Sequence, residues 1–98
     1  MTTSEFNFVL KQAVLHFGYR AQALQTIEEC GELIQVLCKD LNDRLQDRDA
    51  LIDEMADVQL MLWQLEEFVD INAVKTRMNE KAERLAQRLN INLKKQKQ

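Results

Sequence analysis

The feature that most restricts the fold of this chain is its lack of turn residues. Its 98 residues include no proline and only two glycines. Leu, Ala, Glu, Gln, Lys and Arg, which favour helices, dominate the rest. Chains of short strands need far more Gly and Pro at their turns. We therefore expect an all-α fold in a single domain spanning residues 1–98, with a frayed basic tail over about 92–98.

Apolar residues recur at helical spacing in four stretches, which predicts four helices. Thr2 and Glu5 have the spacing of a capping box at the first helix, and Gly18 marks its end. Asp49 and Asn72 are candidate N-caps of the third and fourth helices. The expected helices cover residues 4–17, 20–41, 50–69 and 73–91.

The apolar stripes of these helices exceed what a small domain needs for its own core. The third helix is apolar on a second flank as well, and a helix that is apolar on most sides is buried on most sides. A chain of this length buries little surface by itself. We therefore expect a four-helix bundle completed by oligomerisation. The expected stripe of the second helix is Leu24, Ile27, Ile34, Leu37, Cys38 and Leu41. Gly31 lies on the same stripe, where it would allow a neighbouring helix to approach closely. The expected stripe of the fourth helix is Val74, Met78, Ala82, Leu85 and Leu89.

Charge is distributed unevenly along the chain. Residues 1–70 carry 14 acidic and 5 basic side chains, whereas residues 71–98 carry 2 acidic and 8 basic ones. An acidic chain is a poor general binder of nucleic acid. Apolar runs are too short to cross a membrane, and the first residues lack the pattern of a signal peptide. Cys30 and Cys38 are too far apart on one helix to form a disulfide bond, so we expect reduced thiols and a cytoplasmic location.

Two acidic clusters stand out within the acidic part. The first contains Glu28, Glu29 and Glu32, and the second, 21 residues after Glu32, contains Glu54 and Asp57. Carboxylates three residues apart lie side by side on a helix and repel each other. Two such pairs on neighbouring helices would form an oxygen-rich site suited to a hard divalent cation such as Mg²⁺.

The second cluster is the more informative one. On a helical projection Glu54 shares its direction with Met61 and Leu65, and Asp57 shares its direction with Phe68. A carboxylate on an apolar face is costly unless it is paired. A salt bridge or a metal ion would each pair it. Residues 49–74 contain no Lys or Arg, so no cation comes from this helix itself.

Arg77, Lys81, Arg84 and Arg88 form a basic stripe beside the apolar stripe of the fourth helix. Such residues often serve only as charged flanks whose stems cover apolar surface. Alternatively, some of them grip phosphate oxygens, for which the planar donors of Arg are well suited.

The pattern Glu28-Glu29-x-x-Glu32, a gap, then Glu54-x-x-Asp57 resembles the signature of the MazG-like all-α nucleoside triphosphate pyrophosphohydrolases. The flanking segments also resemble small phage-type and bacterial members, over roughly residues 14–90. The resemblance implies a helical bundle that assembles as a homodimer or homotetramer. It further implies Mg²⁺-dependent hydrolysis of (d)NTPs to (d)NMP and pyrophosphate, with Mn²⁺ as a possible substitute.

The resemblance also assigns roles to residues. Glu29, Glu32, Glu54 and Asp57 would bind the metal, and Glu28 would bind a second ion or help to activate water. Gln22, Arg77, Lys81 and Arg84 match positions that contact substrate. Two alternatives stay open: the same fold acting on phosphoribosyl-ATP or an alarmone, and a non-catalytic helical adaptor whose acids form interhelical salt bridges.

Overall fold

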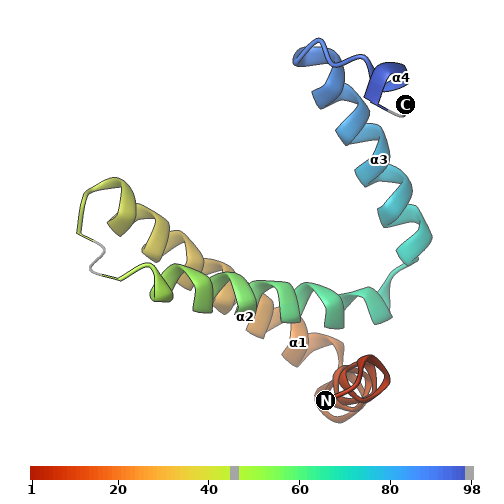
Figure 1. Cartoon of the computed structure of the whole chain (residues 1–98). Helices are drawn as coiled ribbons and strands as arrows, with labels where there is room; N and C mark the ends of the chain where they lie inside the picture. Colours follow the sequence, from red (N-terminus) through yellow and green to blue (C-terminus); the bar gives the residue numbers. More distant parts are fainter. Residues whose placement is uncertain (45–46, 97–98) are drawn as a thin grey trace.

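The computed structural model describes residues 1–44 and 47–96, and every regular element in these ranges is helical. This confirms the all-α prediction. Figure 1 shows a long bent helix, an antiparallel partner and a third helix that departs from the pair. The elements are α1 (Thr3–Leu41), α2 (Asp49–Leu65), the short 3-10 helix η1 (Glu66–Phe68), α3 (Ile71–Arg88) and the single turn α4 (Leu93–Gln96).

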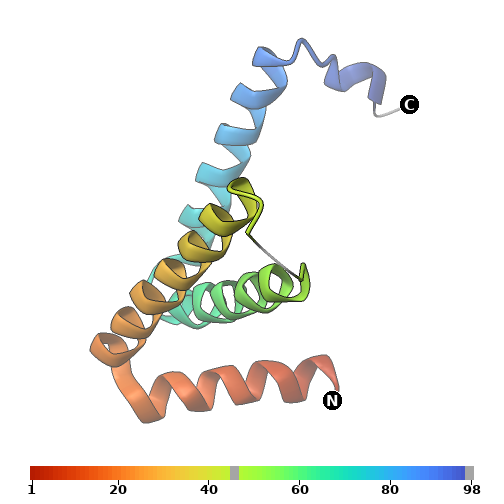
Figure 2. The same cartoon turned by 90° about the vertical axis from the view of Figure 1, so that its left-hand side faces the viewer.

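Helix α1 consists of two straight halves joined at Gly18. This residue has φ 81° and ψ 172°, a combination that essentially only glycine adopts. The first half begins with the expected capping box: Glu5 N donates to Thr2 Oγ1, and Thr2 N donates to Glu5 Oε1. In Figure 2 the first half of α1 runs at a steep angle to the second half. Gly18 therefore ends the first helix as predicted, although the chain continues directly into the second.

The second half of α1 and helix α2 form the central pair of the molecule (Figure 1). Buried residues from both helices meet there, including Gln22 and Thr26 of α1 and Met61 and Gln64 of α2. The Nε2 atom of Gln22 donates to Oε1 of Gln64 over 2.8 Å, a buried hydrogen bond that ties the two helices together. A polar contact thus lies where the sequence suggested only apolar packing.

The start of two helices differs from the predictions. Arg48 rather than Asp49 is the N-cap residue of α2, and Asp47 Oδ1 accepts from the backbone N–H of Asp49. At α3 the cap is Asp70, whose carboxylate accepts from the N–H groups of Asn72 and Ala73. Each cap lies one or two residues earlier than expected because an Asp outside the helix already satisfies the free N–H groups.

Helix ends also differ slightly from the expected bounds. α2 tightens into η1 after Leu65, and α3 ends at Arg88, with Asn90 at a positive φ of 57° just beyond it. Part of the tail that was expected to fray forms the helical turn α4, and residues 97–98 lie outside the described ranges.

Helix α3 points away from the α1–α2 pair (Figures 1 and 2). The radius of gyration is 17.2 Å, whereas a compact domain of this length has about 13 Å. The accessible surface is 8358 Å², about 2,500 Å² more than expected for a compact monomer of this mass. A four-helix bundle is therefore not formed within one chain.

The predicted inward faces of two helices are exposed in the single chain. On α1, Leu24, Ile27 and Ile34 are exposed, and the side that meets α2 carries Gln22 and Glu29 instead. On α3 and its C-cap residue, the large stripe residues are exposed because no other helix of the described residues packs along α3. These residues are Val74, Met78, Leu85 and Leu89. Nothing lies within 4 Å of a Cβ built on Gly31, so the close approach expected there is also missing within the chain.

Candidate metal centre and adjoining cleft

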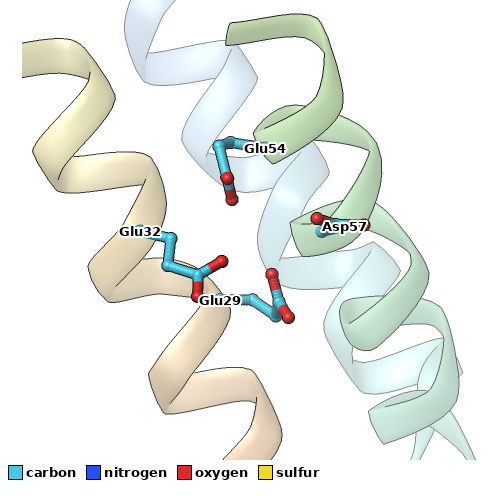
Figure 3. A group of neighbouring side chains, drawn as sticks. All are labelled: Glu29, Glu32, Glu54 and Asp57. Carbon is cyan, nitrogen blue, oxygen red and sulfur yellow. The ribbon is translucent and has the colours of Figure 1, made fainter. Parts of the chain in front are cut away.

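Four carboxylates meet between α1 and α2. Glu29 and Glu32 come from α1, and Glu54 and Asp57 come from α2; Figure 3 shows all four turned toward the space between the helices. One oxygen of each lies within 4.8 Å of one oxygen of every other. The antiparallel pairing causes this, because it sets one i, i+3 pair opposite the other.

The burial of these side chains differs across the cluster. Glu29, Glu32 and Glu54 are half-buried, whereas Asp57 is exposed. The Oε2 atoms of Glu29 and of Glu54 are buried and have no hydrogen-bond partner. A buried carboxylate oxygen without a partner costs about 1–3 kcal/mol or more. These two unsatisfied oxygens belong to the same cluster, one on α1 and the other on α2.

The pKa of Glu29 reflects the repulsion among these carboxylates. The hydrogen bond donated by Gln25 Nε2 over 2.8 Å is the largest influence and lowers the pKa of Glu29. Burial and the negative charges of Glu32 and Asp57 act in the other direction, and together they raise the pKa of Glu29 above its ordinary value. The carboxylates therefore repel one another when nothing positive lies among them.

The geometry fits a hard divalent cation. Around Mg²⁺, oxygens on opposite sides of the ion are about 4 Å apart, and around Ca²⁺ about 5 Å. The spread of up to 4.8 Å needs at most a small closure around the smaller ion. An ion at the centre would satisfy the two orphaned oxygens and offset the repulsion. The donor set, all carboxylate oxygens, is also the type that such ions prefer.

Among the described residues, no positive side chain lies close enough to the four carboxylates to take this role. Within the described residues, the ion pair that closes to within 4.0 Å is Arg48 with Asp40, at 3.3 Å, and it lies outside the cluster. An arrangement of interhelical salt bridges, which the adaptor hypothesis requires, is therefore not what this part of the chain shows. Among the described residues, Glu54 and Asp57 therefore have no cationic partner from the same chain.

The other predicted site residues lie at varying distances from the cluster. Glu28 is exposed and is not among the four converging carboxylates. Arg77, Lys81 and Arg84 are exposed on α3, which leads away from the α1–α2 pair (Figure 1). A single chain thus does not bring its basic stripe to its acidic cluster.

Gln22 is buried, and it lines a cleft of about 320 Å³ next to the cluster, together with Phe17, Ala21, Gln25, Met61 and Gln64. Sequence reasoning selected Gln22 but missed Gln64 and Gln25. A signal did exist: Gln25 precedes Glu29 by four residues, and Gln64 follows Asp57 by seven, so each amide shares a helix face with an acid of the cluster.

A second, larger cleft of about 540 Å³ lies between the first half of α1 and the end of α2. Phe6 and Trp63 meet in it edge to face, with ring centres 5.7 Å apart. Tyr19 packs instead on Phe68, and the centres of the two rings are 5.1 Å apart. Of Phe17, Tyr19 and Trp63, Phe17 is the one that borders the cleft beside the carboxylates.

No helix of the described residues is long and apolar enough to span a membrane. No curated protein and no solved structure matches the chain significantly. A family model described as the MazG nucleotide pyrophosphohydrolase domain matches residues 17–89. The match includes all four converging carboxylates, the second half of α1, and the whole of α2 and α3. It covers well over half of the chain, and the chain therefore belongs to the MazG nucleotide pyrophosphohydrolase domain family.

Proposed function

We propose that this protein is a Mg²⁺-dependent nucleoside triphosphate pyrophosphohydrolase, which converts a (d)NTP and water into a (d)NMP and pyrophosphate. The observation that carries the proposal is the meeting of Glu29, Glu32, Glu54 and Asp57, with two buried oxygens unsatisfied. Membership of the MazG family supports the reaction class. Mn²⁺ is expected to substitute, because it accepts the same oxygen ligands.

The four carboxylates would hold the ion between α1 and α2. Glu29, Glu32 and Glu54 are half-buried and would bind it from the protein side, whereas Asp57 is exposed and would leave the ion open to a substrate from solvent. A bound Mg²⁺ would polarise the phosphate and lower the pKa of a bound water. A triphosphate is itself strongly anionic, so the carboxylates alone would repel it.

Glu28 is the proposed residue for orienting the attacking water. It is exposed on the helix that carries two of the metal ligands, so it can face solvent while they face the ion. A carboxylate in that position accepts a proton from water without displacing a ligand.

The proposed phosphate contacts, Arg77, Lys81 and Arg84, require assembly of the protein. They lie on α3, away from the cluster of the same chain. A homodimer or homotetramer would place α3 of one subunit beside the α1–α2 pair of another. The excess accessible surface of about 2,500 Å² per chain is in the range that obligate interfaces remove. The opposite charges of the two regions favour the same arrangement.

The direct experiment is pyrophosphate release from the eight standard NTPs and dNTPs, with Mg²⁺, with Mn²⁺ and with EDTA. The proposal expects release of pyrophosphate, not of orthophosphate, for at least one nucleotide and only with a metal present. An assembly that binds no divalent cation and cleaves none of these nucleotides would contradict it. Cleavage of phosphoribosyl-ATP or an alarmone alone would keep the chemistry and change the substrate.

A further inference from the structure

The cleft beside the carboxylates has the composition of a small ligand site. Its lining combines an aromatic ring, Phe17, and a thioether, Met61, with three carboxamides. Pockets for small organic molecules are mostly apolar with a few placed polar groups, and the volume of about 320 Å³ lies at the small end of their range. The cleft is thus of a size for a nucleobase and its sugar.

The cleft adjoins the proposed metal centre on both helices. On α1, Gln25 lines the cleft and donates to Glu29 Oε1 over 2.8 Å, so one side chain touches both places. On α2, Met61 and Gln64 follow Asp57 by four and seven residues, which keeps them on one helix face. A ligand whose phosphate reaches the metal therefore has the cleft one to two helical turns away, about 6–10 Å along α1.

The hydrogen bonds within the cleft determine which polar atoms remain free. Gln64 Nε2 donates to the backbone carbonyl of Leu60 over 3.1 Å, which fixes the orientation of the Gln64 amide. Its Oε1 then accepts from Gln22 Nε2 over 2.8 Å, which fixes the orientation of Gln22 in turn. Among the described residues, no hydrogen bond is donated to Gln22 Oε1, because the hydrogen bond to Gln64 uses the Gln22 Nε2 atom. Gln22 lines the cleft, so the lining includes a side chain with a free acceptor, held in place by the buried amide pair.

We propose that this cleft is the nucleoside subsite, and that Gln64 is a specificity-determining residue because it holds Gln22 Oε1 ready to accept an N–H of the base. The proposal depends on the pyrophosphohydrolase function above. Phe17, which is 60% exposed, would cover one face of the base. Apolar contact with an aromatic ring and a fixed hydrogen-bond acceptor together discriminate a base better than contact alone.

The test compares two ligands that share phosphates and differ in the nucleoside: an α,β-methylene nucleoside triphosphate and inorganic tripolyphosphate, both with Mg²⁺. Gln64→Met removes the amide and keeps the length of the side chain, and Gln59→Met makes the same change at an exposed position of α2. Gln64→Met is expected to weaken binding of the nucleotide about fivefold to tenfold, the equivalent of one lost hydrogen bond. Binding of tripolyphosphate should change less than about twofold, and the differences among the four bases should shrink.

Phe17→Ala provides a second test that does not disturb a buried residue. It should weaken the nucleotide about fivefold and leave tripolyphosphate unaffected, since stacking on an aromatic ring contributes about 1 kcal/mol. Equal losses for both ligands, or no loss in either variant, would overturn the subsite. Wild-type protein that binds tripolyphosphate but no nucleotide would overturn the subsite alone. If it binds neither ligand and no Mg²⁺, the proposed function fails as well.

Discussion

Gln25 holds one oxygen of the Glu29 carboxylate, and the other oxygen is buried with no partner. Gln25 Nε2 lies 2.8 Å from Oε1, while Oε2 is buried without a hydrogen bond. The carboxylate is thereby oriented but not satisfied. Across the helix pair, Glu54 Oε2 is also buried with no hydrogen-bond partner. Two buried, unsatisfied carboxylate oxygens on facing helices would each gain a partner from a positive ion between them.

Glu54→Gln is expected to abolish Mg²⁺-dependent release of pyrophosphate, by at least about a hundredfold, because a neutral amide is a far weaker ligand for a hard cation. The helical circular dichroism spectrum should be unchanged. Stabilisation of the protein by Mg²⁺ in thermal melts should also be lost. Asp53→Asn, one residue away and exposed, is the matched control and should keep both properties. Turnover like that of wild type in Glu54→Gln would remove this residue from the site.

The metal-free protein should show a pH dependence that comes from Glu29. Its pKa is raised in the folded protein, so Glu29 favours the folded state when protonated and opposes it as pH rises through the raised pKa. In EDTA, Glu29→Gln should therefore gain stability over wild type as the pH rises from about 4 to about 7. Thermal melts at several pH values measure this, with Glu67→Gln as an exposed control. Excess Mg²⁺ should reverse the order, and a pH-independent difference in EDTA would contradict the argument.

The two glycines should respond in opposite ways to alanine. Gly18→Ala is expected to destabilise the protein by about 1–3 kcal/mol, because φ 81° with ψ 172° is nearly closed to side chains with a Cβ. Gly31 is in regular helix and has open space around its Cβ position, so Gly31→Ala should stabilise by up to about 1 kcal/mol. Urea titrations of both variants measure the difference. Destabilisation in Gly31→Ala would indicate that a helix of another subunit lies against it.

The exposed stripe of α3 should be an interface in the assembled protein. Met78 is 63% exposed in the single chain, so Met78→Asp should cost a monomer little. In an oligomer the same change buries an unpaired charge, and the assembly should dissociate. Sedimentation velocity measures the mass, and Glu80→Asp is a control on the same helix. A monomeric wild-type protein, or an unaffected oligomer in Met78→Asp, would exclude this face from the interface.

Arg84→Ala tests whether the basic stripe reaches the substrate across that interface. If Arg84 contacts the β or γ phosphate, KM should rise by about tenfold or more, since charged hydrogen bonds contribute about 1.5–3 kcal/mol. Pyrophosphate release measured against nucleotide concentration gives KM, and the oligomer mass should be checked alongside. An unchanged KM in an intact oligomer would make Arg84 only a charged flank of the helix.

Local features were largely predictable from the sequence. The helical class follows from composition, the capping box at Thr2 from two residues three apart, and the break at Gly18 from the one residue type that allows it. Glu54 could be recognised because it shares a helix face with Met61, which is indeed buried. These features depend on side-chain periodicity and backbone sterics, which act over a few residues.

Only the tertiary structure decided which face of each helix meets its neighbour. The sequence alone pointed to the apolar stripe of Leu24 and Ile27 as the inner face of α1, yet Gln22 and Glu29 meet α2 instead. Periodicity identifies an apolar face but does not tell whether the same chain or another subunit covers it. The bond between Gln22 and Gln64, 42 residues apart, has the same origin. It forms because α1 and α2 pack antiparallel in one register, and no local pattern encodes that register.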